Sequence, residues 1–422
     1  MSNKVKIVVL IVFGLLLSFF GCEKAEKKEL VFRITWTDYS GRGVAIQKIV
    51  DEYNADNKKY KIILESGDEN FETVEALIND DYHSIIYVLP YRYVKYFGER
   101  GLLVDLSSYF LEEKDFFYPE LWKLAMVDDQ VFGIPWLSHT ICLIYNKTLL
   151  DQAGINPADI NSLETFVDAL ELVVATTDAQ GVGLVGADHN DISWMVNQFI
   201  YGFGSTLVDE SNRIVSINNQ KSIEAITFYK DVLGPLAQST WVDDTGVEVM
   251  NYFRNQEIAF EFQGVWGITD IEKNGNPFET GIINLETIEL SPEVGPLLLA
   301  IEPSMSETDQ SEAIKFIKYM ISSQAQEMIM KGEYSPERDQ YYPFRVPARI
   351  DLASSLIFTD NPQYLPFIEG FTNPSIDVPT AAWQIIKTEL YAPGLHQVMM
   401  GTMTIEDFLQ NLQTEGNRLL NP

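Results

Sequence analysis

The fold of this chain is decided by residues 131–155, which read VFGIPWLSHTICLIYNKTLLDQAGI. Gly133 to Trp136 open the stretch, and because Pro cannot donate a ladder hydrogen bond, we expect no paired central strand there. The apolar run Ile141–Tyr145 is too short for a helix and indicates a strand buried on both faces. A short helix follows and stops at Gly154. With the polar residues Ser138 to Thr140 before the strand, the pattern is typical of a hinge between two packed regions.

The same residues carry a resemblance to a known family. They stand as Phe132-Gly133-Ile134-Pro135, Ser138-His139-Thr140, Leu143-Ile144-Tyr145-Asn146-Lys147 and Ala153-Gly154. This string resembles the first crossover of the extracellular solute-binding proteins of ATP-binding-cassette sugar importers, the family that includes maltose-binding protein. Weaker similarity extends from about residue 30 to residue 418.

The resemblance implies an α/β fold of the two-lobe, periplasmic-binding-protein-like kind. Each lobe is expected to be discontinuous in sequence, with a hinged ligand cleft between the two. The first lobe would contain residues 30–138 and 287–340, and the second lobe residues 139–286 and 341–422.

Length and composition narrow the class of protein. A chain of 422 residues with 46% hydrophobic residues is long enough for two or three domain-sized cores and has an ordinary globular composition. The formal net charge of −31 is unusually negative. It argues against a nucleic-acid-binding surface, which requires clustered Lys and Arg, and against anionic ligands as the default.

The first residues predict a secretory signal. Lys4 and Lys6 precede an apolar run at residues 7–20, which is short for a membrane-spanning helix. The run ends before Gly21-Cys22, which resembles a bacterial lipobox. The resemblance implies a signal peptide over residues 1–21, lipidation of Cys22 and a tether over residues 22–29. The protein would then be extracytoplasmic, anchored to the periplasmic or extracellular face of the bacterial cell membrane. A simple signal and an uncleaved anchor are the alternatives.

Strands alternate with helices in the first part of the chain. Residues 30–36, 60–66 and 84–89 have the pattern of strands, and amphipathic helices lie between them. This order predicts βαβ units and a largely parallel sheet, in which ligands bind outside the carboxyl ends of the strands. The side chains that fall there are the first candidates for a ligand site: Trp36, Asp38, Tyr39, Asn70, Tyr91 and Arg92.

Helix-start signals mark the second half of the chain. Asn161 followed by Glu164 indicates a capping box, and Thr404 followed by Asp407 indicates the start of the last helix. Pro379 stands where a further helix is expected to begin.

The sequence contains few signs of a cofactor site, a metal site or a catalytic centre. Residues 181–186 satisfy the GxGxxG pattern, but a helix precedes them and a strand runs through them, so dinucleotide binding is not expected. The four histidines lack metal-ligand spacing, and Cys142 in its apolar strand is expected in the core. We therefore predict no catalytic residue, metal or cofactor. The sequence leaves open a pair of carboxylates that the fold brings together.

Aromatic residues beside polar loops give the positive signal. A sugar ring presents an apolar face to Trp or Tyr, and its hydroxyl groups bind planar polar side chains. Trp194 follows the polar loop that contains Asp191, which is either a cleft loop or a solvated turn. Trp266 and Trp383 resemble the family's sugar-stacking tryptophans, and a place in the core is the alternative for each.

Two further cleft candidates have alternatives as well. Arg92 resembles a cleft arginine of the family and is otherwise a surface residue. His139 stands where the family usually has Asp or Glu, and is otherwise a packed hinge residue. If its neutral ring accepts a hydrogen bond from a sugar hydroxyl, affinity should fall as the pH drops from about 7.5 to about 5.5.

The resemblance implies capture of a carbohydrate, with an oligosaccharide expected, by cleft closure and its delivery to the permease of an ATP-binding-cassette transporter. The protein would be a monomer without enzymatic activity. One alternative is the same scaffold with a non-sugar ligand such as a polyamine, which would need several carboxylates against the ligand. The other is a lipid-anchored glycan-degrading enzyme, which would need two carboxylates about 5–9.5 Å apart.

Overall fold

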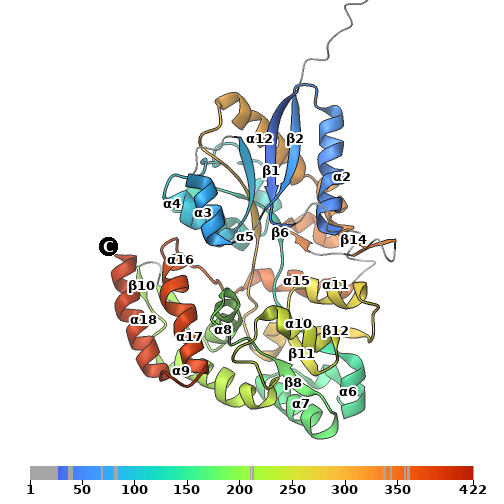
Figure 1. Cartoon of the computed structure of the whole chain (residues 1–422), viewed down its shortest axis with the longest axis vertical. Helices are drawn as coiled ribbons and strands as arrows, with labels where there is room; N and C mark the ends of the chain where they lie inside the picture. The colour runs from blue at the N-terminus through green and yellow to red at the C-terminus, as the bar shows by residue number, and fades with distance from the viewer. Residues whose placement is uncertain are drawn as a thin grey trace, which may run out of the picture.

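The computed structural model describes residues 27–36, 41–67, 70–79, 84–209, 211, 213–335, 339–342, 345–355, 358 and 362–421. Two lobes lie one above the other, joined by several passages of the chain (Figure 1). The predicted signal peptide, Cys22, Asp38 and Tyr39 lie outside the described residues. Within those ranges, every helix is too short or too polar to cross a membrane.

The first lobe is built on a six-stranded sheet with the order β16-β6-β13-β3-β1-β2. Its strands are β1 (Lys28–Ile34), β2 (Tyr60–Ser66), β3 (Ile85–Pro90), β6 (Ile134–Ser138), β13 (Leu297–Ile301) and β16 (Val346–Pro347). β1 pairs in parallel with β2 and β3, which confirms the predicted βαβ units. The other pairs, β13 with β3 and β6 and β16 with β6, are antiparallel.

Helices pack around this sheet and complete the core of the first lobe. Phe32 of β1 contacts the rings of Trp136 and Phe316 edge to face, with centroids 5.9 and 5.0 Å apart. Two short hairpins lie outside the sheet. The remaining elements of the lobe are α2 (Gly41–Asp56), α3 (Phe71–Asn79), α4 (Tyr91–Glu99), η1 (Lys114–Phe116), α5 (Pro119–Leu124), β4 (Met126–Val127), β5 (Gln130–Val131), α12 (Glu307–Met320), α13 (Ser323–Met330), β14 (Glu333–Ser335), β15 (Gln340–Tyr342) and η6 (Ile350–Ser354).

The second lobe has a four-stranded sheet with the order β12-β7-β11-β8. Its strands are β7 (Cys142–Asn146), β8 (Gln180–Gly183), β11 (Ile258–Gln263) and β12 (Thr280–Ile283). Phe260 and Phe262 of β11 pack against Phe166 with centroids 5.5 and 6.1 Å apart, and this contact attaches the adjacent helix to the sheet.

Most of the second lobe is helical. Its carboxyl-terminal helices α17 and α18 lie side by side at one end of the lobe (Figure 1). Its remaining elements are α6 (Lys147–Ala153), η2 (Pro157–Asp159), α7 (Leu163–Thr176), α8 (Asn190–Gly202), β9 (Val208–Asp209), β10 (Ile214–Val215), α9 (Gln220–Thr227), the π-helix η3 (Phe228–Leu233), η4 (Gly234–Leu236), α10 (Gly246–Arg254), α11 (Val265–Lys273), η5 (Leu285–Ile288), α16 (Trp383–Ile386), the π-helix η9 (Lys387–Tyr391), α17 (Ala392–Met399) and α18 (Ile405–Leu420).

Three segments run side by side where the lobes meet, and we call them the hinge: residues 138–141, 291–296 and 373–378. Backbone hydrogen bonds join them, from Ile141 N to Glu293 O at 2.9 Å and from Ser375 N to Pro292 O at 2.8 Å. The short elements η7 (Pro362–Tyr364), α15 (Pro366–Glu369) and η8 (Gly370–Thr372) precede the third segment. The backbone oxygen of Phe367 accepts a hydrogen bond from Thr140, which fixes α15 to the hinge.

The lobe boundaries differ from those expected. Leu290 still packs against Gly202 of α8, so the return to the first lobe lies after residue 290 and not at residue 287. β16 pairs with β6, so the chain remains in the first lobe beyond residue 340. At the amino terminus, β1 begins at Lys28, inside the segment expected to be a tether.

Some local sequence signals agree with the structure and others do not. Pro135 lies within β6, which contradicts the expectation of no strand there; the pairing with β13 shifts register beside it, which accommodates a residue without a donor. The capping box uses Ser162 and Thr165, one residue later than expected, because Ser162 has the extended backbone of an N-cap. Thr404 caps α18, as predicted. Pro379 does not begin a helix, because its carbonyl accepts a hydrogen bond from Lys95 of the first lobe.

Candidate functional site

A cavity of about 510 Å³ lies between the two lobes beside the hinge, and we call it the cleft cavity. Side chains of both lobes and of the hinge line it. An adjoining cavity of about 470 Å³ shares Arg92, His189, Asn190 and Asp191 with it. The residues that line the cleft cavity are Arg42, Pro90, Tyr91, Arg92, His139, Ile141, His189, Asn190, Asp191, Trp194, Gly246, Val247, Met250, Gln263, Trp266, Glu293, Gly295, Pro296, Leu297, Arg345 and Lys387.

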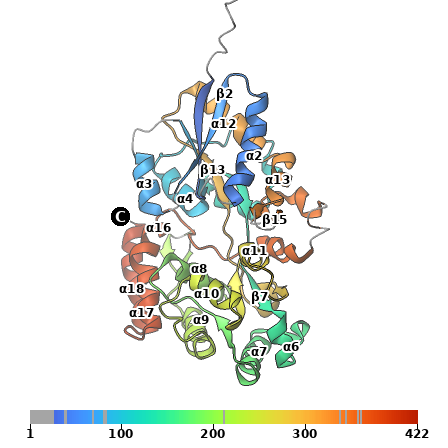
Figure 2. The ribbon, with the colours of Figure 1, turned by 45° about the vertical axis from the view of Figure 1, so that its right-hand side comes forward.

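Four helices begin at this cavity. The first residues of α4, α8 and α10 and the second residue of α11 are among those that line it. In a view turned by 45°, α8, α10 and α11 lie on the side of the second lobe that faces the first (Figure 2). Groups of the protein already occupy part of these helix ends, since Tyr91 N donates to Pro296 O at 3.1 Å and Gly246 N donates to Asp191 Oδ2 at 3.0 Å.

Trp266 forms part of the cavity wall in the second lobe. β11 ends at Gln263, Gly264 caps α11, and the half-buried indole follows with its Nε1 donating to Gln263 Oε1 at 2.8 Å. The His139 ring meets it edge to face, with centroids 4.6 Å apart. The Arg345 guanidinium lies 4.2 Å from the centre of the ring, so Trp266 also forms a cation–π contact across the lobes.

Trp194 and Asp191 form a rigid polar unit at the start of α8. Asp191 accepts hydrogen bonds from Trp194 Nε1 at 3.1 Å and from Gly246 N at 3.0 Å. Nδ1 of His189 lies 3.3 Å from Asp191 Oδ2. Burial acts to raise the pKa of Asp191, but His189, Gly246 and Trp194 outweigh it and hold the pKa below its usual range. The carboxylate is therefore charged, and it fixes the orientation of Trp194.

His139 lies in the first hinge segment and is only 8% exposed. Its Nδ1 has no hydrogen-bond partner among the described residues. A Cβ at position 295 would lie 2.4 Å from His139 Cε1, so glycine is needed there for the ring to fit. Burial, with Arg345 and Arg92 nearby, holds the pKa of His139 well below its usual value. The ring is therefore neutral near pH 7, and the expected loss of affinity between pH 7.5 and 5.5 shifts to lower pH.

Glu293 of the second hinge segment is also buried in the cavity wall. Burial and the nearby Asp377 raise its pKa to about 8, against the opposing effect of Arg92, Lys387 and Arg345. Its Oε2 lies 3.8 Å from His139 Nε2. Since both pKa shifts favour the uncharged forms, this contact is not an ion pair at neutral pH.

A buried ion pair lies directly beneath the cavity. Lys387 of η9 donates to Asp377 of the third hinge segment. Asp377 also accepts hydrogen bonds from Ser193 at 2.9 Å and from Asn197 at 3.1 Å, both on α8. Breaking such a pair by removing one partner costs about 3–5 kcal/mol, because it leaves an uncompensated buried charge. The pair therefore holds the hinge to the second lobe.

The structure brings six predicted site residues to the cleft cavity and one, Asn70, to the adjoining cavity. The six are Tyr91, Arg92, His139, Asp191, Trp194 and Trp266. Tyr91 is fully buried, and its hydroxyl accepts a hydrogen bond from Val378 N at 3.0 Å. Trp36 lines neither cavity and lies 5.9 Å from the guanidinium of Arg42.

The placement of Trp383 in the ligand site is wrong for this structure. The side chain is 0% exposed and its ring packs against Tyr391, with centroids 5.6 Å apart. The helix begins at Trp383 itself and not at Pro379, which turns the indole into the core of the carboxyl-terminal helices.

Sequence reasoning missed Glu293, Asp377 and Lys387. Glu293 was detectable as a single acid four residues before the apolar run at residues 297–301. Lys387 lies next to Ile386, on what the sequence suggests is the buried face of a helix. Nothing in their spacing shows that the three are neighbours, because the hinge brings them together.

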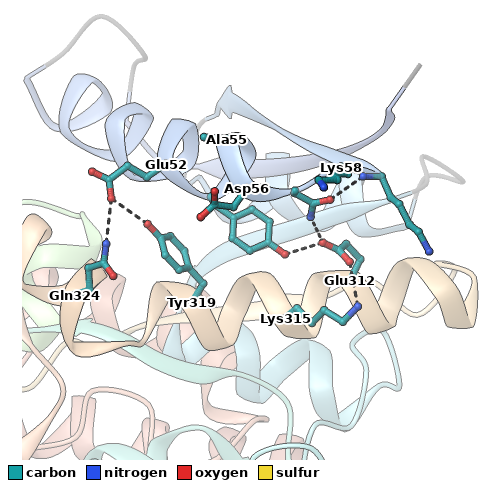
Figure 3. A pocket seen from close by; sticks show the side chains of 11 residues that line it. Glu52, Ala55, Asp56, Lys58, Glu312, Lys315, Tyr319 and Gln324 are labelled. Atoms are coloured by element: carbon teal, nitrogen blue, oxygen red, sulfur yellow. Dashed lines mark hydrogen bonds and ion pairs between the residues drawn. The ribbon is translucent and has the colours of Figure 1, made fainter. Parts of the chain in front are cut away.

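A larger cavity of about 840 Å³ lies on the first lobe, between α2 and the pair α12 and α13 (Figure 3). Tyr319 and Gln324 donate hydrogen bonds to Glu52, while Tyr53 and Asn57 donate to Glu312. All of its lining residues belong to one lobe, so movement of the lobes does not open or close it. Several of its polar side chains are occupied with one another, whereas the cleft cavity is lined by both lobes and is the better candidate for a ligand site.

A metal site requires several ligating side chains together, and hydrolysis of a glycan requires a pair of carboxyl groups. Among the described residues, no group of three or more His, Cys, Asp or Glu side chains is placed to hold a metal ion. Two carboxyl groups, Asp191 and Glu293, line the cleft cavity. Asp191 is engaged by its three neighbours, so the arrangement is suited to orienting a ligand by hydrogen bonds.

Comparison with known proteins agrees with this geometry. The sequence model of bacterial extracellular solute-binding proteins matches residues 48–349. A probable ABC transporter-binding protein of Deinococcus radiodurans is 24% identical over 250 residues, which is 56% of this chain and 58% of that relative. This chain thus spans little more than half the length of that relative.

Solved structures confirm the predicted two-lobe fold. A solute-binding protein of Thermotoga lettingae bound with α-D-tagatose has a TM-score of 0.80 at 16% identity, covering 94% of this chain and all (100%) of that one. The maltose-bound MalE3 protein of T. maritima has a TM-score of 0.78 at 16% identity, covering 93% of this chain and 99% of that one. At these identities the likeness concerns the fold alone.

The two tryptophans predicted to stack on sugar should now respond differently to substitution. Trp266→Ala should weaken saccharide binding by about 1–2 kcal/mol, roughly tenfold or more, with little loss of stability, because its ring is half-buried at the cavity. Trp383→Ala should lower the free energy of unfolding by about 3–5 kcal/mol, because it empties a core site. Titration calorimetry and urea unfolding of both variants measure the two effects. A stable Trp383→Ala variant that no longer binds saccharide would return Trp383 to the ligand site.

Stability should depend on pH through Glu293. The pKa of this carboxyl is raised from 4.5 to about 8 in the folded chain. The protonated group therefore costs the fold no stability below about pH 4.5, and the free energy of unfolding decreases as the pH rises from there to about 8. Glu293→Gln stays uncharged and escapes this loss. The stability of the variant relative to wild type should therefore rise by up to about 1.4 kcal/mol per pH unit between about pH 5.5 and 8, measured by urea unfolding.

The control for this experiment is Glu286→Gln, an exposed carboxyl of the second lobe. Its stability relative to wild type should stay constant over the same range. An equally flat difference for Glu293→Gln would show that Glu293 is charged in the folded chain throughout.

Proposed function

Because this chain belongs to the family of bacterial extracellular solute-binding proteins, we propose that it captures a carbohydrate, preferably an oligosaccharide, and delivers it to the permease of an ATP-binding-cassette importer. The observation that carries the proposal is the cleft cavity itself. Aromatic rings and planar polar side chains from both lobes surround it, including Trp266, Trp194, Gln263, Asn190 and Arg92. This is the combination that a sugar requires, since its faces are apolar and its rim carries hydroxyl groups.

Ligand-driven closure follows from the position of the cavity. Arg92 belongs to the first lobe and Trp266 to the second, so a bound molecule contacts both lobes at once. A ligand that makes more contacts in the closed form shifts the population toward it, with the hinge segments absorbing the change in backbone angles. The relatives named for maltose and tagatose support a saccharide as the molecule that closes the lobes.

Within this proposal the protein performs no chemistry. His139 offers a buried ring nitrogen at the cavity, and a neutral imidazole both donates and accepts hydrogen bonds. Asp191 is held in place by Trp194 and Gly246. These groups orient hydroxyls and need no further role. We expect incubation with saccharides to yield no hydrolysis products.

The full chain should be stabilised by saccharides. A ligand present at 100 times its dissociation constant adds about 2.7 kcal/mol to the free energy of unfolding, because it binds only the folded state. A thermal-shift screen over mono- and oligosaccharides measures this, and Trp266→Ala should lose the shift. Stabilisation by polyamines and by no saccharide would replace the proposal with a non-sugar ligand, and release of reducing sugar would replace it with an enzyme.

The proposal includes an extracytoplasmic monomer anchored by lipid at Cys22. The apolar run at residues 7–20 and Gly21-Cys22 support it, as does membership of an extracellular family. Cys22→Ser should abolish labelling by a radioactive fatty acid and release the protein from membranes, as judged by fractionation. Cys142→Ser is the matched control and should leave both unchanged. Persistent membrane association of the Cys22→Ser variant would indicate an uncleaved signal anchor.

A further inference from the structure

Two buried polar side chains of the hinge lie side by side in the wall of the cleft cavity. His139 belongs to the first hinge segment and Glu293 to the second, and both line the cavity. His139 is only 8% exposed and Glu293 only 7%. Burial of a polar group is unfavourable unless the group gains a hydrogen-bond partner, and protein interiors supply such partners almost without exception. The polar contacts of these two side chains are therefore informative.

The protein itself satisfies this pair poorly. Among the described residues, the close polar neighbour of the Glu293 carboxyl group is His139, whose Nε2 lies 3.8 Å from Glu293 Oε2. That distance is too long for a direct hydrogen bond. An oxygen atom placed beside both groups can bond to each of them at ordinary length. The spacing of the two side chains therefore suits a third group that bridges them.

A hydroxyl group fits the bridging place. It donates one hydrogen bond and accepts others, so it satisfies a donor and an acceptor at once. An uncharged carboxyl group has a donor O–H and an acceptor C=O, and a neutral imidazole has one nitrogen of each kind. A carboxylate accepts only. The uncharged pair therefore holds a hydroxyl in a chain of hydrogen bonds that runs from one side chain to the other.

The surroundings of Glu293 favour its uncharged form. Burial and Asp377 raise its pKa to about 8, against the opposing effect of the cations. A saccharide in the cavity removes further water from the carboxyl group, so binding favours the protonated form still more. The charged and titratable groups that face Glu293 are Asp377 of the third hinge segment, Lys387 of η9, Tyr91 and Arg92 of α4, Arg345, and His139.

The pair also lies next to the aromatic wall of the cavity. The His139 ring meets the Trp266 ring edge to face, with centroids 4.6 Å apart. A Cβ at position 295 would lie 2.6 Å from His139 Nε2, so the glycine there leaves space beside that nitrogen. A hydroxyl held by the pair therefore belongs to a sugar unit that also contacts Trp266.

We propose that Glu293 is a ligand-binding residue: in its uncharged form it holds one hydroxyl of the saccharide together with His139. The ligand then connects two hinge segments through this hydroxyl. The inference rests on the proposed capture of a carbohydrate. It makes the binding of a neutral saccharide depend on one proton of the hinge, so capture weakens in alkaline surroundings.

The first test measures affinity for a neutral saccharide as a function of pH. The probe is the tightest binder among maltose, maltotriose, cellobiose, xylobiose and D-tagatose. Titration calorimetry of the full chain should give a nearly constant Kd between pH 6 and 7.5. Kd should then rise at least about fivefold from pH 7.5 to 9.5, because the protonated form of Glu293 is lost through about pH 8.

Glu293→Gln separates the role of the proton from the role of the shape. Glutamine keeps a donor and an acceptor in nearly the same shape and does not ionise. The variant should bind more weakly than wild type at pH 7, by up to about fivefold, because an amide is the poorer donor. Its Kd should then stay constant to pH 9.5. Glu286→Gln, which changes an exposed carboxyl of the second lobe, is the matched control and should keep the wild-type profile.

The second test asks whether Glu293 and His139 hold the same hydroxyl. Glu293→Ala and His139→Ala should each weaken binding at pH 7 by about tenfold, through lost hydrogen bonds. If one hydroxyl connects the two side chains, the doubly substituted chain should bind within about threefold of the weaker single variant. Independent contacts would instead multiply to about a hundredfold. Urea unfolding identifies the variants that remain folded, and the pH profile of Glu293→Gln decides the question if the alanine variants do not fold.

A wild-type affinity that stays constant to pH 9.5 would overturn the inference. A Glu293→Gln variant with the same alkaline loss as wild type would do so as well, and would assign the titrating group to a neighbour such as Lys387. A folded Glu293→Ala variant with full affinity would exclude the contact, and multiplying losses would exclude the shared hydroxyl. Each of these outcomes leaves carbohydrate capture standing. A chain that binds none of the five saccharides would overturn the proposed function itself, and the inference with it.

Discussion

The backbone pairing of the three hinge segments is the constraint on which the rest of the structure depends. Hydrogen bonds from Ile141 to Glu293 and from Ser375 to Pro292 hold these segments together where the sheets of the two lobes end. Where the chain passes between the lobes in these segments, each segment is therefore fixed relative to the other two. The hinge lies between the two lobes, and helices of both lobes begin on the sides that face each other. The cleft cavity lies between those sides. A change in the hinge backbone would move the walls of the cavity as two rigid bodies.

The hinge also determines the chemistry of the cavity, because it carries buried polar groups that strand pairing alone would not place there. His139, Glu293 and Asp377 come from its three segments. Burial favours the uncharged forms of His139 and Glu293, while Asp377 pairs with Lys387. Uncharged groups that both donate and accept hydrogen bonds suit sugar hydroxyls. The same burial makes stability, and not only binding, sensitive to pH.

The contrast between the chain and its cleft shows how little a net charge says about a site. Most of the 61 acidic residues serve a solvated exterior, where a charge costs little. The two acids of the cleft cavity, Asp191 and Glu293, lie in a less polar medium, where each charge has a longer reach.

The sequence by itself determined the alternation of strands and helices in the first lobe, the crossover at residues 131–155 and six of the side chains at the cleft cavity. These follow from local rules: apolar periodicity, turn residues, and the position of side chains at the carboxyl ends of strands. Only the tertiary structure decided that Pro135 lies within a strand, that Trp383 is core, and that Glu293, Asp377 and Lys387 meet at the hinge. The reason is physical: burial and charge interactions depend on distance in space, and these three residues are brought together only when separate passages of the chain pack side by side.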